Sequence, residues 1–288
     1  MNTRFRRTLL LAAVALGAVG GNLAVAAAPA TASTVQLDGP TLTYDAAPGE
    51  SNRLTISSAG DTLTVTDTGA TVTAGPSCTS ASSTKPTCPA AGVAAMAVSI
   101  GDMNDTASVS GTWIPTTFDD GPGPDAMTGG GAVDTFVAGA GSDTYRGGGV
   151  QDIVDYSSRT APLTVSLDGL ANDGEAGEKD NVGSDVDVVI GGSAGDAITG
   201  SGGSNDLYGG PGDDLLHGGS GNDRLFGGTG TDNLGGDGGN DTLDGGSGGD
   251  VLAGGSGTDT ADYSSRSAPL TSASMVRRTT ARPARATT

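Results

Sequence analysis

The chain has 288 residues, with 33 acidic and 14 basic side chains and a formal net charge of −19 at pH 7. This acidity excludes a nucleic-acid-binding protein, which needs a basic face to meet phosphate. The single histidine excludes chemistry that needs two or more, and 3% aromatic residues exclude a large aromatic core. Glycine, at 51 residues, has more than twice its usual share of about 7%, which indicates disorder unless a sequence period organises it.

Residues 1–32 have the pattern of a secretory signal peptide. Arg4, Arg6 and Arg7 precede an uninterrupted apolar stretch at 9–19, and Ala-Thr-Ala at 30–32 fits the rule for cleavage after small residues. The apolar stretch is shorter than the about 20 residues that span a membrane, and no later segment is apolar enough to do so. We therefore predict a secreted, extracellular protein without a transmembrane segment.

Residues 33–118 form a region with the composition of short β-strands. Apolar and polar residues alternate at 41–44, 53–56 and 61–66. A degenerate repeat at 101–105 favours an extension of the repeat structure that follows, and the alternative is a separate small β-sandwich. Cys78 and Cys88 would meet an oxidising compartment after export. We favour a disulfide over a metal-binding pair, because the only histidine lies far away in the sequence.

A nine-residue period organises the centre of the chain, in a first block at 119–155 and a second block at 191–262. Rows such as GGPGDDLLH (209–217) and GGSGNDRLF (218–226) carry an acidic residue in sixth place and an apolar residue in eighth place. The sixth residue is aspartate in every row except the one that contains Asn205. We predict that the metal ligands are these aspartates: Asp125, Asp134, Asp143, Asp152, Asp196, Asp214, Asp223, Asp232, Asp241, Asp250 and Asp259.

Each row predicts a tight turn followed by a very short strand. The glycine-rich first five residues can adopt positive φ without a clash, and the last three residues direct only the middle, apolar side chain to one face. One buried side chain per row cannot stabilise a row by itself, so the rows must stack. The prediction is an all-β fold, a parallel β-solenoid or β-roll with two rows in each coil.

Stacking aligns the aspartates in files of like charge, which repel one another and disfavour the compact state. Asp196, Asp214 and Asp232 fall in one file, and Asp223 and Asp241 fall in another. Acidic residues far outnumber basic ones between residues 120 and 262, so the protein's own cations cannot neutralise the files. Ca²⁺ accepts about six to eight oxygen ligands in flexible geometry, whereas Mg²⁺ demands a smaller octahedral site. We therefore predict Ca²⁺ between successive coils, bound by aspartates and turn carbonyls.

These rows resemble those of the hemolysin-type calcium-binding repeat (RTX) family of secreted bacterial proteins. The resemblance covers residues 120–262 and implies a parallel β-roll with Ca²⁺ in its turns. Extracellular Ca²⁺ modules bind with dissociation constants of about 10⁻⁴–10⁻³ M, so several sites together would decide folding. We expect the roll to fold on extracellular Ca²⁺ and to be largely disordered without it. The folded module would attach to cell-surface or extracellular-matrix material as its partner. The alternative is a truncated fragment of a larger adhesin or toxin-like exoprotein whose active part is missing.

Two segments depart from the period. Residues 156–190 form an acidic insert with a predicted strand at 163–167, although Asp187 already stands nine residues before Asp196. The tail at 263–288 nearly copies residues 156–164 and then becomes basic, which indicates either a surface-binding tail or a one-base deletion in the coding sequence. The acidic loop of the insert is either a further Ca²⁺ site or a solvated loop: Asp168, Asp173, Glu175, Glu178 and Asp180.

Enzyme motifs are weak in this sequence. His217 is the only histidine, which rules out the two-histidine motif of zinc proteases. The segments 191–195 and 245–249 match G-x-S-x-G in form, but they fall in predicted repeat turns, whereas a nucleophile elbow joins a strand to a helix. We therefore predict that the protein is not an enzyme.

Overall fold

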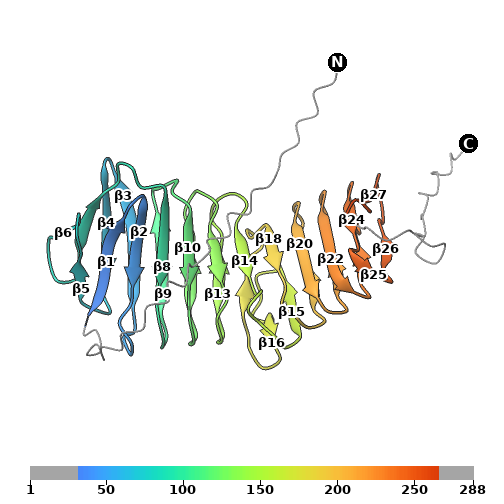
Figure 1. Cartoon of the computed structure of the whole chain (residues 1–288), viewed down its shortest axis with the longest axis horizontal. Helices are drawn as coiled ribbons and strands as arrows, with labels where there is room; N and C mark the ends of the chain where they lie inside the picture. Colours follow the sequence, from blue (N-terminus) through green and yellow to red (C-terminus); the bar gives the residue numbers. More distant parts are fainter. Residues whose placement is uncertain (1–31, 266–288) are drawn as a thin grey trace, which may run out of the picture.

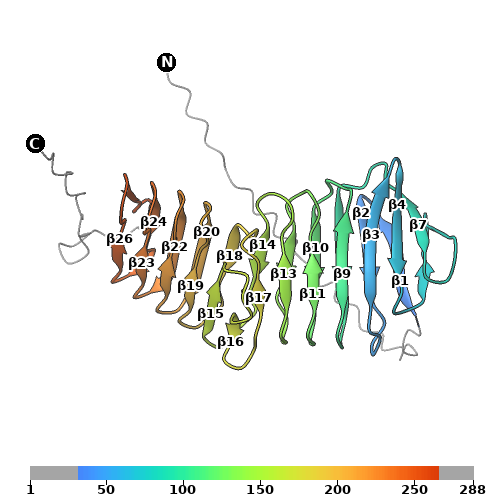
Figure 2. The ribbon, with the colours of Figure 1, turned by 180° about the vertical axis from the view of Figure 1, so that it is seen from behind.

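The computed structural model describes residues 32–265. Within this range the chain contains no helix, and short strands lie across the long axis of an elongated molecule (Figures 1 and 2). Among these residues no helix is long and apolar enough to cross a membrane. The all-β, parallel β-roll expected from the nine-residue period is confirmed. The predicted signal peptide and most of the predicted basic tail lie outside the described residues.

Three sheets make up the roll, and one of them runs along its whole length. This long sheet has 13 strands: β1 (Ser33–Asp38), β2 (Thr41–Asp45), β5 (Val72–Ala74), β8 (Ala95–Ser99), β10 (Thr116–Asp119), β12 (Thr135–Val137), β14 (Ile153–Asp155), β18 (Val188–Ile190), β20 (Asp206–Pro211), β22 (Arg224–Gly230), β24 (Thr242–Asp244), β25 (Ser247–Gly248) and β27 (Thr260–Ala261).

Two shorter sheets share the opposite face of the roll. The N-terminal short sheet contains β3 (Arg53–Ala59), β4 (Thr62–Asp67), β6 (Thr79–Ser80), β7 (Pro86–Pro89), β9 (Thr106–Ser110), β11 (Ala126–Thr128), β13 (Thr144–Arg146) and β17 (Asn181–Val182). The C-terminal short sheet contains β15 (Leu163–Ser166), β16 (Gly174–Glu175), β19 (Ala197–Thr199), β21 (Leu215–His217), β23 (Asn233–Gly235) and β26 (Val251–Ala253).

Alternate rows of the repeat supply strands to opposite faces, so that two rows complete one coil. In the first block, β11 pairs in parallel with β13 and places Met127 opposite Tyr145, eighteen residues further on. In the second block, β20 pairs with β22 and places Leu207 opposite Leu225, again eighteen residues further on. The expected register of two nine-residue rows per coil is therefore confirmed.

The core is a narrow column of eighth-position side chains between the two faces. Met127, Phe136, Ile198, Leu216 and Leu234 each have at most 1% of their surface exposed. Burial of one such side chain stabilises a fold by about 1.5–3 kcal/mol, which is too little to order a nine-residue row by itself. Each row therefore depends on its neighbours in the stack for stability.

The region before the repeats continues the same sheets. Strands β8 and β10 join the long sheet in parallel with β2 and β12, and β9 joins β11 in the N-terminal short sheet. Two antiparallel hairpins, β1–β2 and β3–β4, lie at the N-terminal end of the roll. Cys78 and Cys88 are joined in the disulfide that the sequence favoured. It connects the loop before β6 to β7 at this end of the structure.

The acidic insert supplies strands to both short sheets within a single coil. Strand β17 extends the N-terminal short sheet from β13, whereas β15 begins the C-terminal short sheet next to β19. The carboxylate of Asp173 connects the two strands, because its oxygens accept hydrogen bonds from the backbone N–H groups of Ser166 at 2.6 Å and Val182 at 2.9 Å. The insert therefore separates the two short sheets while the long sheet passes it without a break.

Candidate metal centres in the turns

The structure places the predicted aspartates in the turns, one residue before a repeat strand. Asp125 and Asp143 precede strands of the N-terminal short sheet, whereas Asp196 precedes β19 of the C-terminal short sheet. We use the word file for the sixth-position residues that follow one another, one coil apart, along one edge. Nine of the eleven are buried, whereas Asp250 and Asp259, in the last two described rows, are only half-buried.

Each file is held by a ladder of hydrogen bonds from backbone to side chain. The N–H of Asp125 donates to Oδ1 of Asp143 at 2.8 Å, and the N–H of Asp223 donates to Oδ1 of Asp241 at 2.8 Å. The same contact joins Asp214 to Oδ1 of Asp232 at 3.0 Å. One oxygen of each of these carboxylates therefore accepts a hydrogen bond from the backbone of the preceding coil, and the negative charges of the file remain without a counter-ion.

The second carboxylate oxygen divides the aspartates into two groups. In an open turn, as we use the term, this Oδ2 atom is buried without a hydrogen-bond partner. The open turns hold Asp105, Asp125, Asp143, Asp214, Asp223, Asp232 and Asp241. In a closed turn, Oδ2 accepts a backbone N–H from its own row. The closed turns hold Asp134, Asp152 and Asp196, whose donors are Gly130 at 2.5 Å, Gly149 at 3.1 Å and Gly192 at 2.7 Å.

The backbone conformation of the second residue in the row accounts for most of this division. In the open rows of the second block this residue has positive φ, as in Gly210 (105°), Gly219 (93°), Gly228 (114°) and even Asp237 (64°). Its N–H then does not reach the carboxylate. A Cβ on Gly228 would also collide with the carbonyl oxygen of Gly210 in the preceding coil. Position 228 therefore requires glycine for space as well as for φ.

Carbonyl oxygens approach the free carboxylate oxygens of the open turns. A Cβ placed on the first glycine of a row would collide with the Oδ2 atom of that row. At Gly209 it would also lie 2.8 Å from the carbonyl oxygen of Gly227, and at Gly218 it would lie 2.9 Å from that of Gly236. The space left by the missing side chain is thus bordered by carboxylate and carbonyl oxygens from adjacent coils. Such a donor set suits a hard cation that takes oxygen ligands, and Ca²⁺ is the prime example.

Burial makes these carboxylates resist ionisation. It raises the pKa of Asp125 and Asp143 to about 7, and the pKa of Asp214 and Asp223 to about 6. Neighbouring carboxylates of the same file raise the pKa further, whereas the backbone N–H donors lower it. Three basic side chains of the roll pair with carboxylates outside the files, in the pairs Arg159–Glu175, Arg159–Glu178, Arg224–Asp206 and His217–Asp237.

Two members of a file escaped the sequence prediction. Asp105 donates its N–H to Asp125, and the Oδ1 atom of Asp180 accepts the N–H of Asp143 at 2.9 Å. Asp105 stands twenty residues before Asp125, two more than a regular coil, and Asp180 stands 37 residues after Asp143. The spacing hid both residues, although the pattern of aspartate two residues before a valine in Asp180-Asn181-Val182 was a usable signal.

The rest of the acidic loop is held by the protein's own donors. Glu175 and Glu178 pair with Arg159, whose guanidinium also contacts the carbonyl oxygen of Gly139 in the first block. Asp173 connects β15 and β17, and the exposed Asp168 accepts the N–H of Leu170. The loop is therefore cross-linked by hydrogen bonds and ion pairs, an arrangement that neither sequence alternative described.

The two G-x-S-x-G matches lie in the glycine-rich part of their rows, one in a turn and one across the short strand β25. The Ser193 hydroxyl donates to the carbonyl oxygen of Arg159, and Ser247 lies in the short strand β25. His217 is on the outer surface of β21, where its ring nitrogen lies 3.1 Å from Asp237. The histidine bonds to an exposed carboxylate and to neither serine.

The fold and its turns define a class: a parallel β-roll with nine-residue rows and files of buried carboxylates. The family model described as RTX calcium-binding nonapeptide repeat (4 copies) matches residues 119–154, 182–216, 190–225, 199–234 and 226–261. The matched residues therefore belong to the RTX calcium-binding repeat family, and the predicted resemblance is confirmed. No curated protein matches the chain.

Proposed function

We propose that the chain is a secreted Ca²⁺-binding protein whose β-roll folds when the ion enters the open turns. The observation that carries the proposal is the set of seven buried Oδ2 atoms without a partner. A buried acceptor left unsatisfied costs about 1–3 kcal/mol, and more when it is charged. The seven unsatisfied oxygens together destabilise the ion-free fold by on the order of 7–20 kcal/mol. This cost is as large as the free energy of unfolding of a typical domain, about 5–15 kcal/mol.

Calcium would offset this cost. A site with a dissociation constant of about 10⁻⁴–10⁻³ M contributes roughly 0.4–1.4 kcal/mol at millimolar Ca²⁺. Several sites in one stack therefore decide whether the roll is folded. The cytosol contains little free Ca²⁺, so folding would follow export. The signal-peptide pattern of residues 1–32 and the Cys78–Cys88 disulfide support an extracellular location.

The test is a Ca²⁺ titration of the purified chain followed by far-UV circular dichroism, with Mg²⁺ as the control ion. We expect β-structure to form cooperatively with Ca²⁺, weakly with Mg²⁺, and to disappear when EDTA is added. The double variant Asp223→Ala/Asp241→Ala should need more Ca²⁺ than the control variant Asp119→Ala, whose side chain is exposed on β10. Equal order in EDTA and in Ca²⁺ would refute the proposal.

We propose further that the protein has no catalytic activity and acts by attaching to cell-surface or extracellular-matrix material. Both G-x-S-x-G segments lie in the glycine-rich part of repeat rows, and His217 contacts Asp237 and neither serine, which supports the first part. Pull-down on cell-wall material with Ca²⁺ or with EDTA tests the second part, and recovery that ignores Ca²⁺ would argue against it.

A further inference from the structure

One row of the repeat carries a carboxylate where the other rows carry glycine or alanine. Asp120 is the first residue of the row 120–128, and the first residue of every other row in the two blocks is Gly or, in one case, Ala138. Asp120 follows β10 and faces inward, with 1% of its surface exposed. The row therefore brings an additional carboxylate into the space between two coils.

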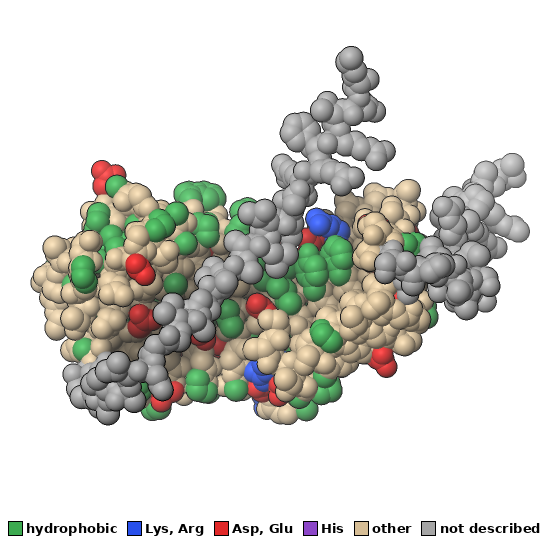
Figure 3. Space-filling view, viewed as in Figure 1, with side chains coloured by type: hydrophobic (Ala, Val, Ile, Leu, Met, Phe, Trp, Pro, Cys, Tyr) green, Lys and Arg blue, Asp and Glu red, His purple; other side chains and the backbone are tan. Residues whose placement is uncertain are grey.

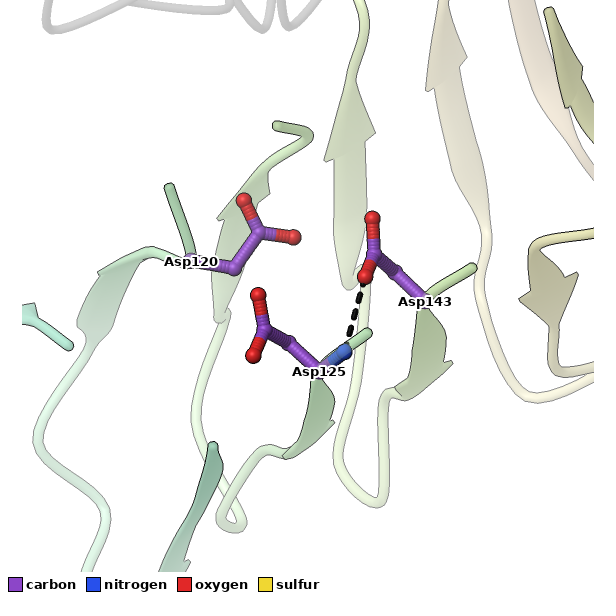
Figure 4. Close-up of side chains that lie close together, drawn as sticks. All are labelled: Asp120, Asp125 and Asp143. Atoms are coloured by element: carbon purple, nitrogen blue, oxygen red, sulfur yellow. Dashed lines mark hydrogen bonds between the residues drawn. The ribbon is translucent and has the colours of Figure 1, made fainter. Parts of the chain in front are cut away.

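Asp120 points toward two members of a file. One carboxylate oxygen from each of Asp120, Asp125 and Asp143 lies within 4.8 Å of the others (Figure 4). Asp120 and Asp125 belong to one turn, and Asp143 belongs to the turn of the next coil. Among residues 32–265 this is the one place where three acidic, histidine or cysteine side chains converge in this way.

Two oxygens in this cluster lack a partner. Oδ2 of Asp125 and Oδ2 of Asp143 accept no hydrogen bond, and water cannot replace the missing donor because the two residues are only 3% and 1% exposed. The oxygens of Asp120 are bonded, one to the N–H of Gly139 at 2.7 Å and one to the hydroxyl of Tyr145 at 2.6 Å. These bonds orient Asp120 and still leave lone pairs, because a carboxylate offers about four acceptor positions.

The charge of the cluster exceeds that of an ordinary pair of coils. Three ionised carboxylates would carry a formal charge of −3, whereas two sixth-position aspartates carry one unit less. The nearby guanidinium of Arg159 is taken by Glu175 and Glu178. A hard multivalent cation is the ligand that satisfies both the unbonded oxygens and the excess charge.

We propose that Asp120, Asp125 and Asp143 form a separate cation site that binds Ca²⁺, or a trivalent ion of similar size, more tightly than the other turns do. Asp120 adds a ligand that the repeat pattern does not contain, and Tyr145 holds that ligand in position. The site fills first as the cation concentration rises. This inference rests on the proposed function, because it assumes that the roll takes up cations in its turns.

The test uses Tb³⁺, which takes oxygen ligands as Ca²⁺ does and emits when a nearby tyrosine is excited. In the full chain, the first bound equivalent should give tyrosine-sensitised emission, with the count of bound ions followed by equilibrium dialysis. Asp120→Asn and Asp120→Gly should weaken this first equivalent by on the order of 10- to 100-fold and leave the later ones in place. Asp119→Asn, which changes the exposed neighbour, should behave as the unmodified chain.

A second variant locates the ion independently of any effect on folding. Tyr145→Phe removes the hydroxyl that orients Asp120, so it should weaken the first equivalent by less than Asp120→Asn does, because all three carboxylates remain, and it should reduce the sensitised emission per bound ion. Unchanged binding in Asp120→Asn, or undiminished emission in Tyr145→Phe, would overturn the inference even if Ca²⁺ still folds the roll. A chain that binds neither Tb³⁺ nor Ca²⁺ would overturn the inference together with the proposed function.

Discussion

Replacing Asp214 with asparagine is expected to stabilise the ion-free roll and to reduce the stability that Ca²⁺ adds to it. Asparagine keeps an oxygen for the N–H of Asp196, which now donates to Oδ1 of Asp214 at 2.8 Å. It also replaces the unpartnered Oδ2 with an amide that can donate to a carbonyl. Asn205 shows that such an amide finds acceptors, since its side-chain amide donates to the carbonyl oxygens of Val186 and Asp187 at 3.4 Å.

The magnitude follows from the burial of the carboxylate. Burial raises the pKa of Asp214 from 3.8 to about 6, and a shift of two units corresponds to at most about 3 kcal/mol above pH 7. The cost of one unsatisfied buried acceptor, about 1–3 kcal/mol, has the same size. Without Ca²⁺ the asparagine variant should therefore be more stable by about 1–3 kcal/mol. Saturating Ca²⁺ should add less stability to the variant than to the unmodified chain, because the variant has lost one charged ligand.

The assay must work on a chain that is poorly folded in EDTA. Trimethylamine N-oxide favours burial of the chain surface, so the concentration that folds half of the protein in EDTA measures the stability of the ion-free roll. We expect this midpoint to fall in Asp214→Asn and to stay unchanged in Asp213→Asn. Asp213 is the exposed neighbour, whose Oδ1 accepts the N–H of Thr231, and asparagine can keep that bond.

Two results would refute the reasoning. If Asp214→Asn needs more osmolyte than the unmodified chain in EDTA, the unpartnered oxygen does not destabilise the ion-free roll. If the variant gains as much stability from Ca²⁺ as the unmodified chain, Asp214 is not a ligand. A parallel series with Asp213→Asn separates either result from a general effect of reduced charge.

Four further outcomes are expected. In EDTA, the free energy of unfolding should fall as pH rises from about 4 to 7, because the buried aspartates hold protons at a higher pH than in the unfolded chain. In millimolar Ca²⁺ the opposite slope is expected. Osmolyte midpoints in EDTA and melting curves in Ca²⁺ over this pH range check the two slopes. Asp134→Asn, in a closed turn, should shift the Ca²⁺ midpoint of circular dichroism less than Asp223→Asn, in an open turn; equal shifts would contradict the division of the turns. Gly209→Ala should weaken the Ca²⁺ response in the same titration because its Cβ would meet a carboxylate, whereas Gly249→Ala, with nothing within 4 Å, should not. Reduction of the disulfide should lower the stability of the Ca²⁺-bound roll to urea by about 2–3 kcal/mol and leave the Ca²⁺ midpoint of the repeats unchanged; a lost Ca²⁺ response would show that the N-terminal end controls the whole roll.

The repeat itself was predictable from the sequence because its structure is local. A period of nine residues sets which side chain faces inward, so the buried column that includes Leu216 and Leu234 follows from the eighth position alone. The position of Asp214 in a turn, and its alignment with Asp196 and Asp232, follow from the same arithmetic. Such features need only the alternation of a strand and the equal length of successive rows.

The tertiary structure decided which carboxylates are free to bind an ion. Asp134 and Asp223 occupy the same place in the repeat. A backbone N–H bonds to Oδ2 of Asp134, whereas Oδ2 of Asp223 has no partner. The difference follows from the backbone conformation of the second residue in each row, which depends on the adjoining coil. Asp180 enters a file only because the insert folds back on β13, and Asp120 reaches Asp143 only because their turns are stacked. Before Asp125 and in the insert, the chain between successive coils varies in length and carries no period, so the places of Asp105 and Asp180 in the file could not be read from the repeat.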